Sequence, residues 1–245
     1  MRVWDIHPGY LSRQSLLGQH AEIHALFAVI ENGKKGYAAH PETLRWKEWP
    51  GGLTRAHDLA VLEMQLRGYN HASPLPPSFE AERKNQPAAH TRVYIDHPVE
   101  QVAILSQKYL EREQSGRIPL PKNVYQFWAN CKYSVMARGY NHYKHIQALL
   151  RGEDSCPLDK SGLLFEQILN LMELPVRGPA LANVTDHLWG YFKREASAGE
   201  RERYMARQSR ELPELIRFLY RLAVKYQRPY LLHSTIFADF TAIKL

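Results

Sequence analysis

Hydrophobic side chains recur at steps of three and four residues over most of the chain, the spacing of one face of an α-helix. The first such run predicts a helix over residues 14–31, which Asn32-Gly33 should end because glycine readily adopts the left-handed conformation found after helices. Its face carries Leu16, Leu17, His20, Ile23, His24, Phe27 and Ile30. Two histidines therefore share a helix face with apolar residues.

The same periodicity predicts further helices and little else. Leu59, Leu62, Glu63 and Leu66 indicate a second helix that stops at Gly68. More are expected over residues 98–114, 122–150, 160–173, 179–196 and 200–227, the last interrupted by Pro213. No segment alternates polar and β-branched residues over the length of a strand, so we predict an all-α fold with little sheet.

Two proline-rich breaks divide the pattern. Residues 72–92 contain Ser73-Pro74-Leu75-Pro76-Pro77 and are predicted to form a loop. Residues 115–121 form the second break. The helix before this break is expected to begin at Pro98, because proline suits a first helical turn. We place the domain junction in this second break, giving a first helical domain over residues 1–116 and a helical bundle over residues 117–245.

Composition narrows the class of protein. Hydrophobic residues make up 44% and charged residues 23% of the chain, and no apolar run reaches the roughly 20 residues of a membrane helix. Residues 1–8 lack the features of a signal peptide. Only Cys131 and Cys156 are present, too few for a disulfide framework. These features predict a soluble, cytoplasmic protein.

The net charge of +7 suggests an anionic partner, and its distribution is uneven. Residues 1–100 hold 11 Lys+Arg and 11 Asp+Glu, so residues 101–245 hold the other 21 of 32 and 14 of 25. The surplus lies in the second region. It fits nucleic-acid binding and equally a mildly basic solvent-exposed face.

The first helix carries a candidate metal pair, His20 and His24, which flank Glu22. Two histidines at i and i+4 can bind one metal ion. No third ligand follows at a recognisable spacing, so half-buried core histidines are the favoured interpretation. We predict no metal site and no cofactor.

The segment after this helix, residues 32–46, mixes basic and aromatic groups. Lys34, Lys35 and Arg45 lie in it beside Tyr37 and Trp46. Such a segment can contact phosphates and stack on bases. It is a weak signal for nucleic-acid binding when taken alone.

The order of these pieces resembles the pyrimidine-dimer DNA glycosylase family of the phage endonuclease V type, over residues 1 to about 110. The resemblance rests on Arg2, Gln14, Glu22, Asn32-Gly33-Lys34, Gly36-Tyr37, His40-Pro41-Glu42-Thr43-Leu44-Arg45-Trp46 and Arg67-Gly68-Tyr69-Asn70-His71-Ala72-Ser73-Pro74-Leu75. It implies a helical enzyme that cuts the glycosidic bond of a damaged base with its N-terminal amine and then breaks the strand.

The resemblance also implies roles for residues. Glu22 matches the catalytic acid, and the amine of Met1 falls at the nucleophile's position, because the bulky Arg2 should prevent removal of Met1. Damaged double-stranded DNA is the implied partner, contacted by Arg2, Gln14, Lys34, Lys35, Arg45 and Arg67. The chain departs from the family pattern at Ala21, where an arginine is usual, and it lacks an arginine on the following turn.

Residues 120–240 resemble the YbgA-type domain of unknown function. The resemblance rests on Lys132-Tyr133-Ser134-Val135-Met136-Ala137, His142-Tyr143, Asn183-Val184-Thr185-Asp186-His187-Leu188-Trp189-Gly190-Tyr191-Phe192-Lys193 and Pro229-Tyr230-Leu231. Six polar side chains on otherwise apolar helices are candidates for a pocket that takes a planar base: Tyr133, His142, Tyr143, His187, Tyr191 and Lys193. Core packing of the same residues is the alternative.

Basic residues follow the last predicted helix at steps of three, four or seven residues, which are helical spacings. They are Arg203, Arg207, Arg210, Arg217, Arg221, Lys225 and Arg228. Such a stripe could track a phosphate backbone, with Arg217 and Arg221 at its centre. A solvated face paired with Glu211 and Glu214 explains the pattern equally well.

The favoured function is a DNA repair glycosylase and lyase that acts on pyrimidine dimers or related lesions. A non-catalytic nucleic-acid-binding protein is one alternative. An enzyme that handles thiolated pyrimidines, suggested only by domains found fused to the YbgA type, is another.

Overall fold

The computed structural model describes residues 2–33, 35–82, 93–151, 157–207 and 212–239. It divides into two compact units, Met1–Leu120 and Pro121–Leu245. The expected all-α fold is confirmed: helices dominate, and the described residues form one isolated bridge, Asn123 with Pro157, and no strand. None of these helices combines the length and apolar character that a membrane crossing requires.

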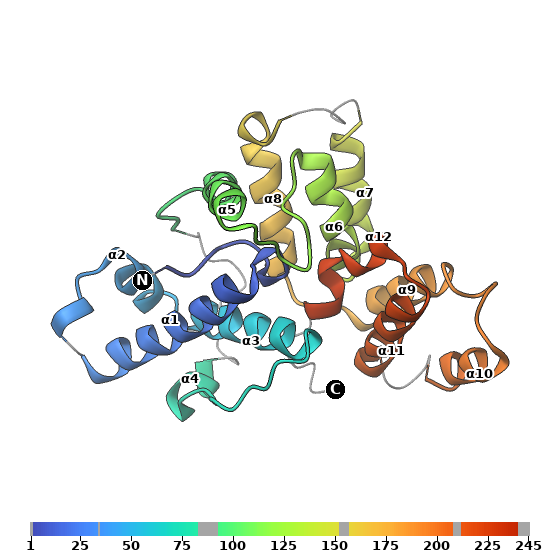
Figure 1. The fold of residues 1–245 in the computed structure, drawn as a ribbon, viewed down its shortest axis with the longest axis horizontal. Helices are drawn as coiled ribbons and strands as arrows, with labels where there is room; N and C mark the ends of the chain where they lie inside the picture. The colour runs from blue at the N-terminus through green and yellow to red at the C-terminus, as the bar shows by residue number, and fades with distance from the viewer. Residues whose placement is uncertain (1, 34, 83–92, 152–156, 208–211, 240–245) are drawn as a thin grey trace. The chain divides into compact units, whose positions relative to one another are not determined.

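The first unit is built around two helices that run side by side, α1 and α3 (Figure 1). Its elements are η1 (Pro8–Tyr10), α1 (Arg13–Asn32), η2 (Lys35–Tyr37), α2 (Pro41–Lys47), α3 (Pro50–Leu66), α4 (Pro77–Glu82) and α5 (Pro98–Arg112). The core joins Val3, Ile23, Leu26, Phe27, Trp46, Leu53, Leu75 and Phe79. The start of the chain is thus part of the core.

Helix α1 forms and ends as its sequence predicts. The Ser12 side chain accepts a hydrogen bond from the Ser15 N–H at its start, and Gly33 ends it at φ 59°. A side-chain acceptor at the first position and a left-handed glycine after the last are common helix boundaries. The predicted helix that stops at Gly68 is likewise confirmed as α3, with Gly68 at φ 74°.

Two short helices lie where the sequence indicates loops. Helix α2 falls within the basic and aromatic segment, where Pro41 begins it and His40 caps it. Helix α4 falls within the proline-rich stretch and begins at Pro77. Both begin at a proline, which suits a first turn, but each is too short to show helical periodicity.

A buried ion-pair network lies near the C-terminal end of α3 in the first unit. Glu63 is fully buried and accepts hydrogen bonds from Arg67 at 2.7 Å and from Arg117 at 2.7 and 2.9 Å. The Ile118 N–H donates to the Gly9 carbonyl at 2.9 Å. Arg117 and Ile118 therefore belong to the first unit, which extends past the predicted junction at residue 116.

This network predicts a loss of stability in acid. Burial raises the pKa of the Glu63 carboxyl, but the charges and hydrogen bonds of Arg117 and Arg67 overcome it and hold the pKa below its ordinary value of 4.5. A lowered folded-state pKa stabilises the protein above the unfolded value, and the effect disappears as pH falls through the folded value. We expect unfolding of the first unit to become easier below about pH 4.5, and less so in Glu63→Gln. Hydrogen exchange of α3 peptides across this range measures the difference.

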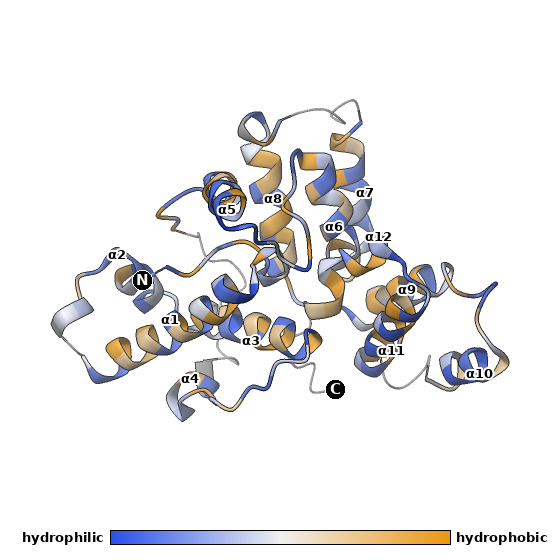
Figure 2. Ribbon diagram, viewed as in Figure 1, coloured by the Kyte–Doolittle hydropathy of each residue, from blue (hydrophilic) through white to orange (hydrophobic). Residues whose placement is uncertain are grey.

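The second unit packs its helices around α6. Its elements are α6 (Val124–Met136), α7 (Tyr140–Leu149), η3 (Leu158–Lys160), α8 (Gly162–Glu173), α9 (Gly178–Trp189), α10 (Ala198–Arg207), α11 (Leu212–Lys225), α12 (Pro229–Leu232) and η4 (Thr235–Ala238). Phe127 of α6 stacks on Phe165 of α8 at 3.7 Å between ring centroids. Figure 2 shows the contrast between the mostly hydrophobic α8 and the mostly hydrophilic α10.

The prediction of one helix over residues 122–150 is wrong, because the chain forms α6 and α7 with a break at 137–139. The Arg138 side chain, 1% exposed, pairs with Asp239 and donates to the carbonyls of Leu174 and Met172. These partners lie far along the chain. The break at residues 137–139 therefore coincides with long-range contacts of Arg138, which the spacing of nearby residues does not predict.

Candidate functional site

The N-terminal segment of the first unit is held against α1 and α2 by backbone hydrogen bonds. The Trp4 N–H donates to Gln19 Oε1 at 2.9 Å, and the Val3 N–H donates to Glu42 Oε1 at 3.3 Å. The Val3 carbonyl accepts from Arg45 Nη2 at 2.8 Å. Val3 is 1% exposed and packs in the same cluster as Ile23. The segment therefore has a fixed path along α1.

The predicted catalytic acid, Glu22, lies on α1 directly before Ile23. It follows Gln19 by three residues, so the two side chains lie on neighbouring turns of one face. Glu22 is half-buried, and no hydrogen bond or ion pair joins its carboxylate to another residue in the described part of the chain. The predicted nucleophile, Met1, lies outside the described residues. A carboxylate without a protein partner is thus placed on the helix that anchors residues 3 and 4.

Two predicted DNA contacts lie at the surface of this unit. Arg2 pairs with Asp96, lies over the Trp4 ring at 5.0 Å, and keeps 35% of its side chain exposed. Gln14 is exposed and accepts a hydrogen bond from Gln114 at 2.9 Å. Lys34 lies outside the described residues, as does the side chain of Lys35.

Two other predicted DNA contacts, Arg45 and Arg67, are turned inward. The Arg45 side chain is 5% exposed and pairs with Asp5 at 2.9 Å and Glu42 at 2.8 Å. Arg67 pairs with Glu63 and donates to the carbonyls of Pro8, Gly9 and Leu11. This placement indicates that Arg45 and Arg67 hold the N-terminal segment in place. It does not favour the phosphate contacts that the sequence suggested.

A cluster of four histidines lies between α1, α3 and the segment after α3. His20 and His24 come from α1, His57 from α3, and His71 from the following segment. One ring nitrogen of each lies within 4.8 Å of those of the other three. His20 and His24 were paired from the sequence, whereas His57 and His71 were missed because no local spacing links them to the α1 pair. The sequence signal for His71 was its place within the motif that starts at Arg67, and no motif contained His57.

Lowered pKa values favour the neutral state of His20, His24 and His71. Burial, followed by the charges of His24, His57 and His71, lowers the pKa of His20 to about 4. Burial, followed by the charges of His57 and His71, also lowers the pKa of His24. For His71, burial and His57 lower the pKa more than a backbone hydrogen bond with Ser73 raises it. Neutral imidazoles keep one ring nitrogen able to accept a hydrogen bond or bind a metal.

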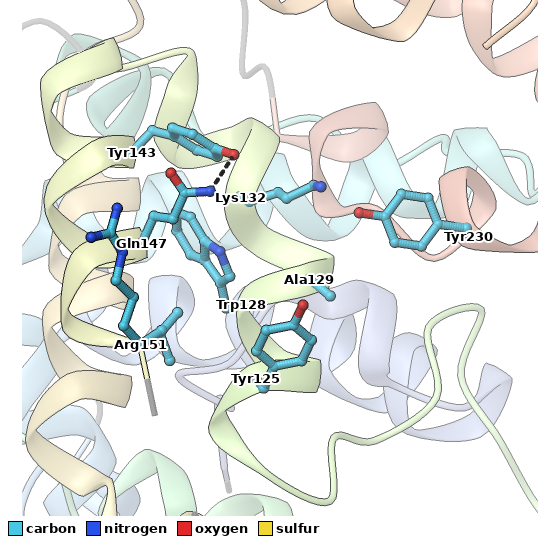
Figure 3. A pocket seen from close by; sticks show the side chains of 9 residues that line it. Tyr125, Trp128, Ala129, Lys132, Tyr143, Gln147, Arg151 and Tyr230 are labelled. Carbon is cyan, nitrogen blue, oxygen red and sulfur yellow. Dashed lines mark hydrogen bonds between the residues drawn. The ribbon is translucent and has the colours of Figure 1, made fainter. Parts of the chain in front are cut away.

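The second unit contains a pocket of about 560 Å³ between α6, α7 and α12 (Figure 3). Its lining residues are mostly aromatic or cationic: Tyr125, Trp128, Ala129, Lys132, Tyr143, Gln147, Leu150, Arg151 and Tyr230. Lys132 and Tyr230 point toward one another in Figure 3, and the ammonium of Lys132 lies 5.1 Å from the Tyr230 ring centroid. The pocket therefore offers aromatic faces beside positive charge.

Of the six residues predicted to form a pocket, Tyr143 lines this one. Tyr133 and Tyr191 lie beside it, since their hydroxyls are 3.2 Å apart and the Lys132 ammonium lies 5.0 Å from the Tyr133 ring. His142, His187 and Lys193 are not among the lining residues. Burial, followed by the hydrogen bond with Tyr191, raises the pKa of the Tyr133 hydroxyl, so this phenol stays protonated at neutral pH.

The basic stripe is not one continuous helix face. Arg203 lies on α10, whereas Arg217, Arg221 and Lys225 lie on α11. Arg217 pairs with Glu214, Lys225 with Glu200, and Arg228 with Glu195. Arg221 is exposed without a hydrogen bond or ion pair to another residue in the described ranges, and Arg210 and the Arg207 side chain lie outside them. Pairing of this kind favours the solvated-face interpretation.

Each of the two units contains a region that is similar to a known protein family. Residues 1–76 match the family model described as pyrimidine dimer DNA glycosylase. Residues 132–241 match a family described as protein of unknown function (DUF1722). Both resemblances found in the sequence are confirmed, the first over the region that carries Glu22 and the second over the region that carries Lys132 and Tyr230. No curated protein and no solved structure matches the chain.

Proposed function

We propose that the first unit is a DNA glycosylase and lyase that acts on pyrimidine dimers or related base lesions, with Met1 and Glu22 as its catalytic residues. The observation that carries this proposal is the family match over residues 1–76, together with the position of Glu22 on the helix that anchors Val3 and Trp4. Its carboxylate has no partner within the described ranges. Because the substrate is DNA, we expect the protein to work in the cytoplasm.

In the proposed reaction, the α-amine of Met1 attacks C1′ of the damaged nucleotide as the bond from C1′ to the base breaks. An α-amine has a pKa of about 7.7–8.0, so a useful fraction is unprotonated at neutral pH. Glu22 stabilises the positive charge that develops on the sugar. It then gives a proton to O4′ as the C1′–O4′ bond breaks, the sugar ring opens and the imine forms. Removal of a proton from C2′ then expels the 3′ phosphate and breaks the strand.

Borohydride trapping tests this mechanism. The purified chain is mixed with ultraviolet-irradiated duplex and borohydride, which reduces an imine to a stable amine, and the product is weighed by mass spectrometry. We expect an adduct of chain and DNA that is absent with undamaged duplex and absent when the α-amine is acetylated. An intact mass that retains Met1 is part of the expected result. A trapped adduct attached to a lysine would contradict the proposal.

A non-catalytic nucleic-acid-binding protein is the competing function, favoured by the exposed Arg221 on α11. It predicts salt-dependent DNA binding without adduct or strand cleavage. The trapping experiment separates the two functions directly.

We propose that the second unit binds a planar anionic ligand, such as a nucleotide, in the pocket around Lys132. Replacing Lys132 with Met should weaken binding of a nucleoside monophosphate about 10-fold or more, because a charge-assisted hydrogen bond is worth roughly 1.5–3 kcal/mol. Titration followed by the tryptophan fluorescence of the chain and by calorimetry measures the change. Thiouracil, which has no phosphate, tests the thiolated-pyrimidine alternative in the same assay.

The matched control is Lys193→Met, since Lys193 is exposed and lies outside the lining. Equal affinity of the Lys132 and Lys193 variants for the monophosphate would remove Lys132 from the binding site.

A further inference from the structure

We propose that His20, His24, His57 and His71 bind one divalent transition-metal ion, for which Zn²⁺ is the best fit. The site is independent of the proposed glycosylase chemistry. Four protein ligands make a closed site, which is typical of structural rather than catalytic zinc. The ion would tie α1 to α3 and to the segment that follows α3.

The geometry of the cluster fits a four-coordinate site that is slightly open. The ligand nitrogens lie within 4.8 Å of one another. With Zn–N bonds of about 2.0–2.1 Å, neighbouring nitrogens of a tetrahedral site are roughly 3.3 Å apart. Ring centroids are separated by 4.6 Å for His20 and His24 and by 5.4 Å for His57 and His71. Metal binding would require the four rings to rotate so that their nitrogens move closer together.

The second observation is the set of unsatisfied nitrogens. The Nε2 atoms of all four histidines are buried and have no hydrogen-bond partner among the residues that the structure describes, and His57 is 2% exposed. A buried polar atom without a partner is unfavourable. Four such atoms at one place are unusual in a folded protein, and a single metal ion satisfies all of them together.

The other ring nitrogens have contacts typical of metal-binding histidines. His57 Nδ1 lies 3.2 Å from Asp58 Oδ1, and His71 has a backbone hydrogen bond with Ser73. A carboxylate or backbone oxygen at one ring nitrogen fixes the tautomer and presents the other nitrogen to the metal. These contacts orient two of the four rings toward the cluster.

The ligand set determines the class of ion. Imidazole nitrogens suit Zn²⁺, Ni²⁺ and Cu²⁺, whereas Mg²⁺ and Ca²⁺ require oxygen ligands. Zn²⁺ has no geometric preference of its own, so it accepts the arrangement that the helices impose. Glu22 is not a ligand, because a two-residue step on an α-helix turns about 200° away from His20.

Metal binding to the full-length chain tests the proposal. The protein is dialysed against a chelator, returned to metal-free buffer and titrated with ZnSO₄ by calorimetry, and bound zinc is counted by mass spectrometry. We expect one Zn²⁺ per chain, a higher melting temperature, and a tetrahedral nitrogen spectrum when Co²⁺ replaces it. X-ray absorption of the zinc form should show imidazole scatterers alone. None of these readouts depends on DNA cleavage.

Variants connect binding to the cluster. His20→Gln with His24→Gln should weaken Zn²⁺ binding by roughly 100-fold or more, since removal of contacting ligands costs more than the 10–100-fold of outer-shell changes. His71→Gln, which leaves both helices untouched, provides the same test should the double variant fail to fold. The control is His145→Gln, on the exposed side of α7. No stoichiometric binding by the natural chain, or unchanged binding by His71→Gln, would overturn the proposal.

Discussion

Replacing Glu22 with Gln is expected to lower strand cleavage of ultraviolet-irradiated duplex by about 100-fold or more, the usual contribution of a general acid or base. Glutamine keeps the size of the side chain and its place on α1 but carries no negative charge and transfers no proton. The loss should appear in the rate of cleavage at saturating DNA, with little change in DNA affinity, because Glu22 meets the substrate only at the reacting sugar. Single-turnover kinetics separate the two quantities.

The matched control lies on the same helix. Glu31 is an exposed residue of α1 that accepts a hydrogen bond from Ser78 at 2.7 Å. Glu31→Gln should cleave at the natural rate. Retention of full cleavage and of the trapped adduct by Glu22→Gln would remove Glu22 from the mechanism.

Replacing Glu63 with Gln should destabilise the first unit by about 3–5 kcal/mol, the usual cost of removing one partner from a buried ion pair. Arg67 and Arg117 both point at Glu63, and their side chains are 11% and 9% exposed. Without the carboxylate, two positive charges face one another where water has little access. We expect the melting temperature of this unit to fall by roughly 10 °C or more.

An exposed ion pair provides the comparison. Glu214 and Arg217 lie on α11 with side chains 44% and 57% exposed. Glu214→Gln should change the stability of its own unit by less than about 1 kcal/mol, because water screens such pairs. Hydrogen exchange resolves the two units within one chain. Equal effects of the Glu63 and Glu214 variants would show that burial does not set the strength of the Glu63 network.

The helices that the sequence predicts best are those whose boundaries are local. Helix α1 has an apolar face, a serine before its first turn and Gly33 after its last, all of which are visible in sequence. The break between α6 and α7 coincides with Arg138 and its pair with Asp239. Nothing near residue 138 reveals that pair, since its two members are brought together only by the folded chain.

The candidate sites likewise contain some residues that local sequence patterns indicate and others that only the folded chain brings together. Glu22 and Met1 were predicted as catalytic residues from the resemblance to the pyrimidine-dimer DNA glycosylase family, which rests on the order of motifs along the chain. Only His20 and His24 of the histidine cluster were indicated by the sequence. His57 and His71 approach them through the packing of α3 against α1. The resemblance placed Arg45 and Arg67 among the DNA contacts. Their pairing with Glu42 and Glu63, one helical turn away, turns them inward instead.

Helix α5 determines how long a recombinant fragment of the glycosylase-like unit must be. The family match ends at residue 76, yet Gln101 accepts from the Asp5 N–H at 2.8 Å and the Tyr109 hydroxyl accepts from the Ser12 N–H at 2.7 Å. A truncated gene that stops at the end of the match would lack these partners and Arg117. Recombinant fragments should therefore continue to residue 120, and shorter ones are expected to be insoluble when expressed.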